Sequence, residues 1–166
     1  MDIRIYTDGA CSKNGYDGAI AGWGFVVVLV NGELNKAVHS DKGAIPDGTN
    51  NIGELTAIKN AIMYTLNLRR NMPEEPLSVE IYSDSAYCIN GINDWRFKWK
   101  RFGWWRDQQK TQPVRNKELW QEIDAMIDLG YMKFLKCEGH TGIKYNEYAD
   151  KLATSAVKEY KENGTV

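Results

Sequence analysis

The chain has 166 residues, of which 43% are hydrophobic and 26% charged, and its formal net charge is −1. These values are typical of one globular domain, long enough to bury a core of its own without disulfide staples. A net charge near zero gives no whole-molecule basis for binding a polyanion, so any such surface must be local.

The first predicted strand, residues 3–9, alternates β-branched and aromatic residues with polar ones and ends at Asp8 and Gly9. Residues 22–30 are apolar enough for a buried strand, and Asn31-Gly32 is a hairpin signal. Residues 33–43 then return as a third strand, so this part of the chain is predicted to form an antiparallel meander.

A helical period follows the turn Pro46-Asp47-Gly48 and places four apolar residues on one face: Leu55, Ile58, Ile62 and Leu66. Asn51 is the predicted N-cap of this helix. Glu54 lies three residues further on, which is the spacing of a capping box, so its carboxylate has a purely structural interpretation.

Residues 79–85 repeat the first strand, because both end in a hydroxyl residue followed by an acid, Asp8 in one and Asp84 in the other. A strand, helix and strand in this order form a right-handed crossover, which makes the two strands parallel. Both acids are then expected at the carboxyl edge of one sheet, where open α/β sheets bind ligands. Clustered carboxylates raise each other's pKa, so several ionised acids at one edge imply a bound cation.

The remaining elements are a helix marked by Leu119, Ile123, Met126 and Ile127, a strand at 131–137 and a helix at 145–160. Residues 161–166 are a polar tail. The sequence therefore predicts one mixed-sheet α/β domain at 1–160. The cysteines, Cys11, Cys88 and Cys137, form no C-x-x-C pair and are interpreted as buried residues of a reducing cytosol. No apolar run approaches the roughly 18 residues of a membrane span, and the chain is expected to be cytoplasmic and complete.

Each acid has an ordinary interpretation when it is taken alone. Asp8 and Asp84 could simply start turns, although the repeated pattern argues against this. Asp150 lies at the border of the apolar face of the last helix, where an aspartate is usually only solvated. His140 lies in a glycine-flanked loop, Gly139-His140-Thr141-Gly142, where a lone histidine usually has no special role.

The segment from Trp95 to Lys117 has a net charge of +7, with eight lysine or arginine residues and one acid, Asp107. Six aromatic residues are interleaved with these charges. A grip on a phosphate backbone with aromatic platforms explains both features. Some of the rings could instead pack a protruding helix onto the domain.

In combination, these residues resemble type 1 ribonuclease H over nearly the whole chain. The motifs are Tyr6-Thr7-Asp8-Gly9, Thr49-Asn50-Asn51-Ile52-Gly53-Glu54-Leu55, Ser83-Asp84-Ser85, Gly139-His140-Thr141-Gly142 and Asn146-Glu147 ahead of Asp150-Lys151-Leu152-Ala153. Residues 92–118 are similar to the basic protrusion by which bacterial members grip their substrate.

The resemblance implies a ribonuclease H-like fold, with a five-stranded mixed sheet flanked by helices. It implies an endonuclease that cleaves the RNA strand of an RNA-DNA hybrid with two Mg²⁺ ions, leaving a 3′-hydroxyl and a 5′-phosphate. By analogy, Asp8 bridges both ions, Asp150 completes the ion that activates water, and Glu54 and Asp84 hold the ion at the leaving oxygen. Oxygen ligands favour Mg²⁺, with Mn²⁺ as a substitute. His140 is implied to move protons or to help product release, and the enzyme is expected to act as a monomer.

The resemblance also implies the substrate contacts. Asn14, Asn50, Asn51 and the backbone near Cys11 would meet the RNA strand in the minor groove, where the 2′-hydroxyl distinguishes RNA from DNA. The remaining implied contacts are to the DNA strand and the phosphate backbone: Thr49, Trp95, Lys98, Lys100, Arg101 and Asn116. The chain departs from the family at Asp47, where several members carry arginine, at Ala86, which replaces a longer side chain, and in lacking a proline after Asp8.

Two alternatives remain open. One is another two-metal nuclease of the same fold, such as a transposase, an integrase or a resolvase. The other is a hybrid-binding module that works without metal. The Thr-Asn-Asn and Gly-His-Thr-Gly motifs argue against the first alternative, and the four intact acids argue against the second.

Overall fold

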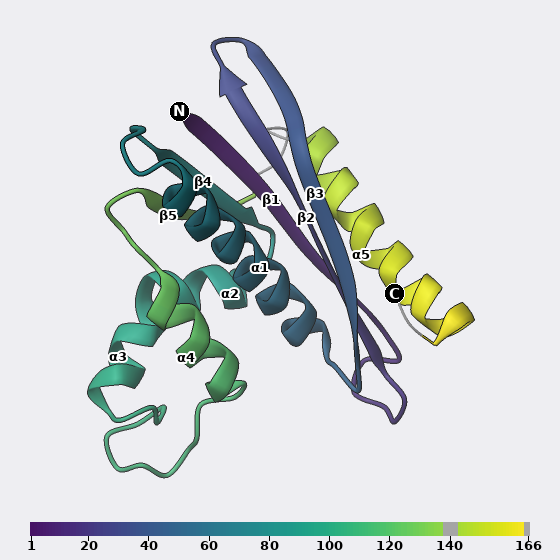
Figure 1. Ribbon diagram of the computed structural model, residues 1–166. Helices are drawn as coiled ribbons and strands as arrows, with labels where there is room; N and C mark the ends of the chain where they lie inside the picture. Colours follow the sequence, from purple (N-terminus) through teal and green to yellow (C-terminus); the bar gives the residue numbers. More distant parts are fainter. Residues whose placement is uncertain (138–142, 165–166) are drawn as a thin grey trace.

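A computed structural model describes residues 1–137 and 143–164. Its centre is a five-stranded sheet in the order β3-β2-β1-β4-β5 (Figure 1). Strands β1 (Asp2–Ser12), β2 (Ile20–Asn31) and β3 (Leu34–Pro46) are antiparallel neighbours, and β4 (Ser78–Ser83) and β5 (Met132–Lys136) continue the sheet in parallel with β1. The predicted antiparallel meander, the parallel pair and the five-stranded mixed sheet are therefore confirmed.

The two strands that share a sequence pattern, β1 and β4, also lie side by side with the matching residues paired. Ile3 of β1 pairs with Val79 of β4, and Tyr6 pairs with Tyr82 in the same parallel ladder. The two tyrosine rings stack with centroids 5.1 Å apart, and Thr7 Oγ1 donates a hydrogen bond of 2.7 Å to the Tyr82 carbonyl. Asp8 and Asp84 each come two residues after this last pair, so the shared register delivers both acids to one place.

The end predicted for the first strand was wrong. The chain was expected to leave the strand at Gly9, but β1 continues to Ser12 because β2 still pairs with it, with Ser12 opposite Ile20. Only the parallel pairing with β4 stops, at Tyr6. Asp8 therefore lies inside β1, at the point where its neighbour β4 ends.

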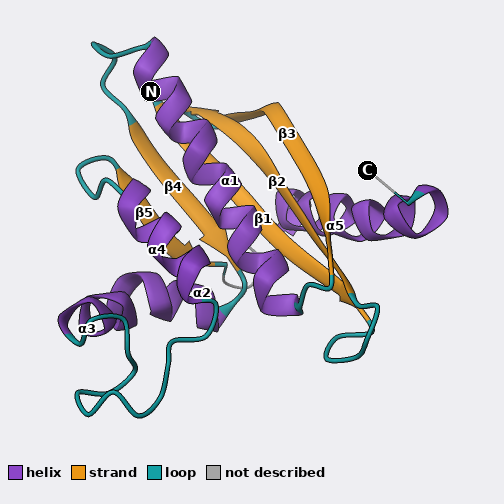
Figure 2. Cartoon of the chain, turned by 60° about the horizontal axis from the view of Figure 1, so that its bottom comes forward, coloured by secondary structure: helices purple, strands orange, loops and turns teal. Residues whose placement is uncertain are grey.

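The two long helices lie on opposite faces of the sheet (Figure 2). Helix α1 (Asn50–Asn71) packs Leu55, Ile58 and Ile62 into the main core, as predicted, together with Ile5 and Ile81 of the strands. Helix α5 (Ile143–Asn163) covers the other face, with Ala149, Ala153 and Ala156 buried. It ends three residues beyond the predicted end at Tyr160.

The N-cap predicted for α1 was also wrong. Thr49, rather than Asn51, caps the helix, and its Oγ1 accepts a hydrogen bond of 3.2 Å from Ile52 N-H. Glu54 is then in the second turn instead of at the third position, too far along to close a capping box. Its side chain is buried toward β1 and is not a cap.

A helical protrusion leaves the sheet after β4 and returns before β5, and its residues 92–118 include the predicted basic segment. It comprises α2 (Ala86–Asn90), the π-helical turn η1 (Gly91–Trp95), α3 (Arg96–Arg101), an irregular loop and α4 (Lys117–Met126). The first three elements run continuously. From the sequence, a protruding helix was only an alternative interpretation of the basic segment, and no helix bounds were predicted between residues 86 and 101.

The three cysteines are free thiols, as expected, but only Cys88 is fully buried, whereas Cys11 and Cys137 are partly exposed. Among the described residues, no helix is both long enough and apolar enough to cross a membrane.

Candidate active site

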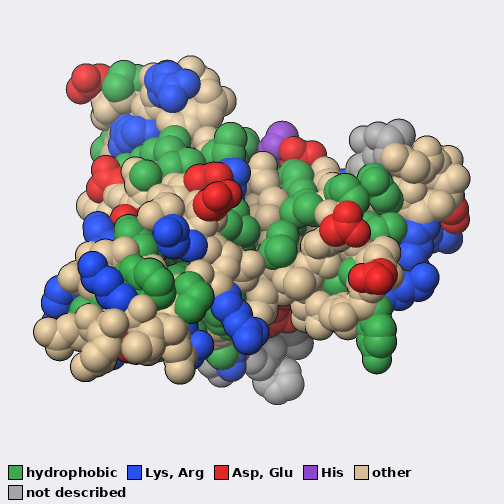
Figure 3. All heavy atoms as spheres, turned by 90° about the horizontal axis from the view of Figure 1, so that it is seen from below, with side chains coloured by type: hydrophobic (Ala, Val, Ile, Leu, Met, Phe, Trp, Pro, Cys, Tyr) green, Lys and Arg blue, Asp and Glu red, His purple; other side chains and the backbone are tan. Residues whose placement is uncertain are grey.

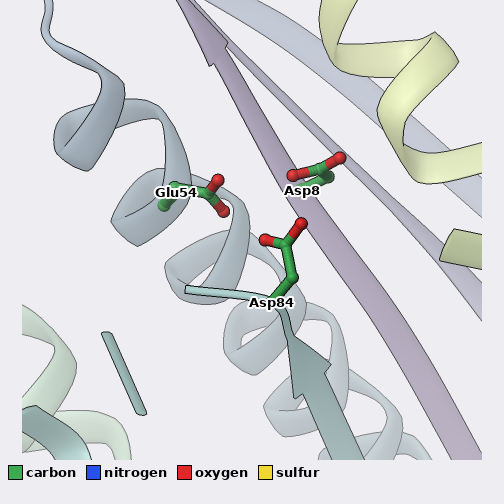
Figure 4. Close-up of side chains that lie close together, drawn as sticks. All are labelled: Asp8, Glu54 and Asp84. Carbon is green, nitrogen blue, oxygen red and sulfur yellow. The ribbon is translucent and has the colours of Figure 1, made fainter. Parts of the chain in front are cut away.

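Three carboxylates converge where β4 ends beside β1. Asp8 comes from β1, Glu54 from the second turn of α1 and Asp84 from the residue after β4 (Figure 4). One carboxylate oxygen from each residue can be chosen so that all three lie within 4.8 Å of one another. Glu54 is buried and Asp84 is exposed, so the cluster is open to solvent on the Asp84 side.

The cluster depends on a close approach of α1 to β1 and β2, which two glycines permit. A Cβ on Gly9 would lie 2.4 Å from the Glu54 nitrogen and 2.7 Å from the Gly53 carbonyl carbon. A Cβ on Gly53 would lie 2.6 Å from the Gly22 carbonyl oxygen. Since any other residue at these two positions would push the helix away, the glycines determine how near Glu54 comes to Asp8.

Glycines of β2 do the same for α5 on the opposite face. A Cβ on Gly22 would lie 2.2 Å from the Ala153 carbonyl oxygen, and one on Gly24 would lie 2.6 Å from Leu152 Cβ. Gly24 is paired with Asp8 across the β1-β2 ladder, so α5 is held against the strand beside this acid. Asp150 lies on this part of α5 and is close enough to act electrostatically on Asp8.

The electrostatics of the cluster favour a cation. Burial, followed by the negative charge of Asp84, raises the pKa of Asp8 to about 7, although the Gly9 N-H donates to Asp8 Oδ1 at 2.9 Å. Burial, followed by the charge of Asp8, raises the pKa of Glu54 to about 9. Glu54 Oε2 is buried and has no hydrogen-bond partner among the described residues. A hard divalent cation would satisfy this oxygen and relieve the repulsion, so the all-oxygen donor set fits Mg²⁺ or Mn²⁺.

The residues proposed to contact the RNA strand gather at the start of α1. Asn14, in the loop after β1, accepts a hydrogen bond of 2.9 Å from Asn50 N-H through its Oδ1. Cys11 Sγ lies 3.5 Å from the carbonyl oxygen of Gly48, directly before the cap Thr49. Asn50 and Asn51 expose their side chains in the first turn. The structure therefore brings the four RNA-strand candidates together, although they come from two segments.

An open hollow of about 440 Å³ lies between the start of α1 and the protrusion. Its lining combines aromatic rings with cations: Asn51, Tyr87, Trp95, Lys98, Trp99, Arg106 and Arg115. The Trp95 ring lies 6.2 Å from that of Tyr87 and 6.1 Å from that of Trp99. Asn116 Nδ2 donates to the Tyr87 hydroxyl at 3.3 Å, which places Asn116 beside the same ring.

The structure separates the cations of the protrusion into two kinds. Lys98, Lys100 and Arg101 are exposed, although Lys98 lies 3.7 Å from Asp94 and Lys100 lies 3.2 Å from Asp124. Arg96 is only 4% exposed and is paired with Asp124. The net charge of +7 therefore overstates what the protrusion presents to a ligand. On the left of Figure 3, cationic side chains (blue) are interspersed with hydrophobic side chains (green).

Sequence reasoning missed two groups in this region. Arg106 and Arg115 were counted in the basic segment but were not singled out as contacts, and Tyr87 was not considered. The eight-residue spacing of Tyr87 and Trp95 gave no usable signal, because the two rings share a helix face only through the extra residue of the π-helical turn, which the sequence did not indicate. His140, the remaining candidate, lies outside the described residues.

Some of the six aromatic residues of the basic segment pack the protrusion onto the domain, as the alternative interpretation proposed. Trp99 is buried and meets Trp120 of α4 at a centroid distance of 5.2 Å, in an edge-to-face arrangement. Trp95 and Trp104 are partly buried against the same core. Phe97 is 43% exposed. Several rings therefore pack the protrusion onto the domain, and Trp95 also lines the hollow.

Comparison with known proteins places these features in one family. A family model described as RNase H matches residues 1–158. The ribonuclease H of Clostridium botulinum strain Hall is 42% identical over 159 residues, which cover 95% of this chain and 97% of that protein. The crystal structure of LC9-RNase H1, described as a type 1 RNase H with the type 2 active-site motif, superposes with a TM-score of 0.74. It is 25% identical, and the match covers 95% of this chain and 72% of that chain. LC11-RNase H1, solved in complex with an RNA/DNA hybrid, has a TM-score of 0.67 at 21% identity and covers 96% and 99% of the two chains.

Proposed function

Because the chain belongs to the ribonuclease H family, we propose that it is an endonuclease that hydrolyses the RNA strand of RNA-DNA hybrids. The observation that carries this proposal is the convergence of Asp8, Glu54 and Asp84, with Asp150 beside Asp8, at one edge of the sheet. We further propose that cleavage is a two-metal hydrolysis, which leaves a 3′-hydroxyl and a 5′-phosphate.

The four acids would hold two Mg²⁺ ions, with Mn²⁺ as a substitute. Asp8 lies centrally and would contribute to both sites, Asp150 would complete one from the α5 side, and Glu54 and Asp84 would complete the other. Bound Mg²⁺ would supply a water of lowered pKa and would offset the charge that develops on the leaving oxygen. Asp8 belongs to a strand, and Glu54 and Asp150 belong to helices held closely against the sheet, so the positions of these three carboxylates are well fixed.

His140 is proposed to transfer protons or to assist product release. An imidazole titrates near neutral pH, and the glycines on both sides permit movement of its loop. This role rests on the sequence alone, since the residue lies outside the described part of the chain.

The RNA strand is proposed to lie against the start of α1. Asn50 and Asn51 expose amides there, and an amide offers both a donor and an acceptor to a 2′-hydroxyl, which is itself both. Asn14 is already engaged with Asn50 N-H, so it would order this turn as well as contact the substrate. Cys11 would contribute through its backbone.

The DNA strand is proposed to cross the hollow beside the protrusion. Trp95 would pack on a deoxyribose, while Thr49 and Asn116 would hold a phosphate. Lys98, Lys100 and Arg101 would contact the backbone further along. Asp47, exposed and in a left-handed turn with φ of 59°, places a negative charge two residues from Thr49. We expect it to weaken phosphate binding there. The enzyme is further proposed to be a cytoplasmic monomer.

The test is cleavage of an end-labelled hybrid, compared with duplex DNA and duplex RNA, with Mg²⁺ and with a chelator. We expect only the hybrid to be cut, only in the presence of metal, and only in its RNA strand. Cutting of duplex DNA would support a related nuclease of the same fold instead. Binding of the hybrid without any cleavage would support a metal-independent binding module.

Asp8→Asn is expected to abolish cleavage and keep the fold. The variant should melt at a higher temperature than the unmodified protein in chelator, because one of the repelling carboxylates is gone. The matched control is Asp2→Asn, at the exposed far end of the same strand, which should cleave normally. Activity of Asp8→Asn within about tenfold of the unmodified protein would contradict the metal assignment, since removing a ligand of both ions should cost far more.

A further inference from the structure

Arg96 is the buried cation of the protrusion. Its side chain is 5% exposed, yet three groups surround its guanidinium. Nε donates a hydrogen bond of 2.6 Å to the Ile92 carbonyl, and Nη1 donates one of 2.7 Å to Asp124 Oδ1. The guanidinium carbon lies 4.2 Å from the centre of the Phe97 ring. Burial of a guanidinium is unfavourable unless its hydrogen bonds are made, so this geometry is tightly specified.

These contacts join the part of the protrusion before the irregular loop, η1 and α3, to the part after it, α4. Ile92 belongs to η1, Arg96 begins α3, and Asp124 lies on α4 after the irregular loop. Asp124 is itself 11% exposed, and its Oδ2 also lies 3.2 Å from the Lys100 ammonium. One carboxylate on α4 therefore holds two residues that are one turn apart on α3.

The same contacts stabilise the π-helical turn. Arg96 N-H donates to the Gly91 carbonyl, five residues back, so the turn contains one residue more than an α-helical turn. The neighbouring Ile92 carbonyl receives the Arg96 side chain. An extra residue in a helix rotates everything that follows it by about 100°. The π-helical turn therefore sets which direction α3 presents to the hollow.

Two lining residues of the hollow depend on this direction. Trp95 is the last residue of η1, directly before Arg96, and Lys98 lies on α3 two residues after Arg96. The Trp95 ring is also placed by its contacts with Tyr87 and Trp99. By contrast, Arg96 is too deeply buried to touch a ligand that occupies the hollow.

We propose that Arg96, together with Asp124, is a positioning residue for binding of the hybrid. Its ion pair and its bond to the Ile92 carbonyl hold the π-helical turn in register, and this register aims Trp95 and Lys98 at the substrate. The inference rests on the proposed function, because it assumes that the hollow receives the nucleic acid.

The test compares Arg96→Met with Arg101→Met. Methionine keeps an unbranched apolar stem but donates no hydrogen bond. Arg101 is an exposed cation of the same helix, with no ion-pair partner among the described residues. Measurements are the dissociation constant for a labelled hybrid in Ca²⁺ across a salt series, kcat and KM in Mg²⁺, and the melting temperature.

Arg96→Met should weaken binding and raise KM by about tenfold, with kcat within about twofold, because a small misplacement of positioning groups is costly. Its log-log salt slope should flatten by no more than about 0.9, the contribution of the displaced Lys98, because the buried guanidinium itself touches no phosphate. Arg101→Met should weaken binding and flatten the slope by about 0.9 if Arg101 neutralises one phosphate. Asp124→Asn should reproduce the effect of Arg96→Met, and Arg96→Lys, which keeps the charge, should restore part of the affinity.

A folded Arg96→Met variant with normal KM would overturn the proposal, and so would one whose salt slope flattens by clearly more than about 0.9, which would indicate that Arg96 itself neutralises a phosphate in addition to Lys98. If Arg96→Met does not fold, Asp124→Asn decides in the same way, since it keeps the shape of the side chain. Failure of the proposed function is distinguishable, because the unmodified protein would then not cleave the hybrid at all.

Discussion

The Glu54 carboxylate occupies a position that is unfavourable for a charged side chain. It is buried, its Oε2 has no hydrogen-bond partner among the described residues, and Asp8 lies beside it. Such a group is retained when it serves a ligand rather than the fold, because a neutral residue would be less costly there. In the absence of metal, its ionisation should therefore lower the stability of the protein.

We predict that metal-free protein loses stability as the pH rises from about 5 to about 9. Burial raises the pKa of Asp8 to about 7 and that of Glu54 to about 9. The folded state therefore binds more protons than the unfolded chain in this window, and its stability must fall with rising pH. Each unit of raised pKa corresponds to about 1.4 kcal/mol.

The measurement is thermal unfolding in chelator across this pH range. Glu54→Gln should melt at a higher temperature at pH 8 and should show a shallower decline, whereas the exposed control Glu33→Gln should follow the unmodified protein. Saturating Mg²⁺ should restore the stability of the unmodified protein at high pH. If the melting temperatures of Glu54→Gln and of the unmodified protein fall equally with pH, ionisation of Glu54 does not destabilise the metal-free protein.

At the scale of elements, the site is assembled by two helices that touch the sheet through glycines. Gly9 and Gly53 admit α1 on one face, and Gly22 and Gly24 admit α5 on the other. Both helices thereby bring an acid to Asp8, because each glycine lets a helix approach the strands more closely than a Cβ would allow. The spacing of the carboxylates is thus a property of backbone contacts.

Gly9→Ala tests this relation. Its Cβ would lie 2.4 Å from the Glu54 nitrogen, so α1 must move away and carry the Glu54 carboxylate with it. We expect a loss of about 1–3 kcal/mol of stability from overpacking and a much larger loss of activity, about 10²-fold, at temperatures where the variant is folded. Calorimetry should show weakened Mg²⁺ binding.

The control for this variant is Gly130→Ala, because that Cβ would meet only the flexible Asp128 side chain at 3.0 Å. It should be close to the unmodified protein in stability, in Mg²⁺ binding and in activity. If Gly9→Ala binds Mg²⁺ as tightly as the unmodified protein, the close contact at Gly9 does not determine the metal site.

The sequence predicted correctly those strands and helices whose residue pattern is visible within a short stretch of the chain. Alternation in residues 3–8 and 79–84 indicated two similar strands, and the intervening helix required them to be parallel. The N-cap was misplaced because Thr49, Asn50 and Asn51 are all good capping residues, and only the backbone shows that Thr49 is the extended residue whose side chain accepts from Ile52 N-H. The π-helical turn was missed because one inserted residue leaves little trace in the apolar period.

For the site, the sequence indicated Asp8 and Asp84 from the strand repeat, and the resemblance added Glu54 and Asp150. It did not indicate the close glycine contacts, since these depend on which strands the helices cross. The burial of Arg96 was equally hidden, because its partner Asp124 is 28 residues away in the chain.

At the scale of the whole molecule, negative and positive features are separated in space. The carboxylate cluster lies at the junction of β1, β4 and α1, and the protrusion lies to the side of the sheet that bears β4 and β5 (Figure 1). Residues 95–117 carry +7, so the rest of the chain carries −8. A polyanionic substrate should therefore be held by the protrusion and approach the acidic cluster only when cations are bound there.

Replacing Lys98, Lys100 and Arg101 by alanine tests whether this local charge binds the hybrid. We expect KM to rise with little change in kcat, because phosphate contacts hold substrate and transition state alike. The log-log salt slope of hybrid binding in Ca²⁺ should flatten by at most about 2.7, or about 0.9 for each phosphate that is no longer neutralised. Lys98 and Lys100 already face Asp94 and Asp124, so the change should fall short of that limit.

The matched control removes three positive charges elsewhere, by alanine at the exposed residues Lys36, Lys158 and Lys161. Both triple variants have the same net charge, so any difference between them reports local contact rather than the overall field of the protein. Trp95→Ala should weaken binding with the slope nearly unchanged, since an aromatic ring on a sugar contributes by apolar contact. If the two triple variants bind the hybrid with equal affinity and equal slope, the protrusion does not grip the phosphate backbone, and its cations serve solubility or another partner.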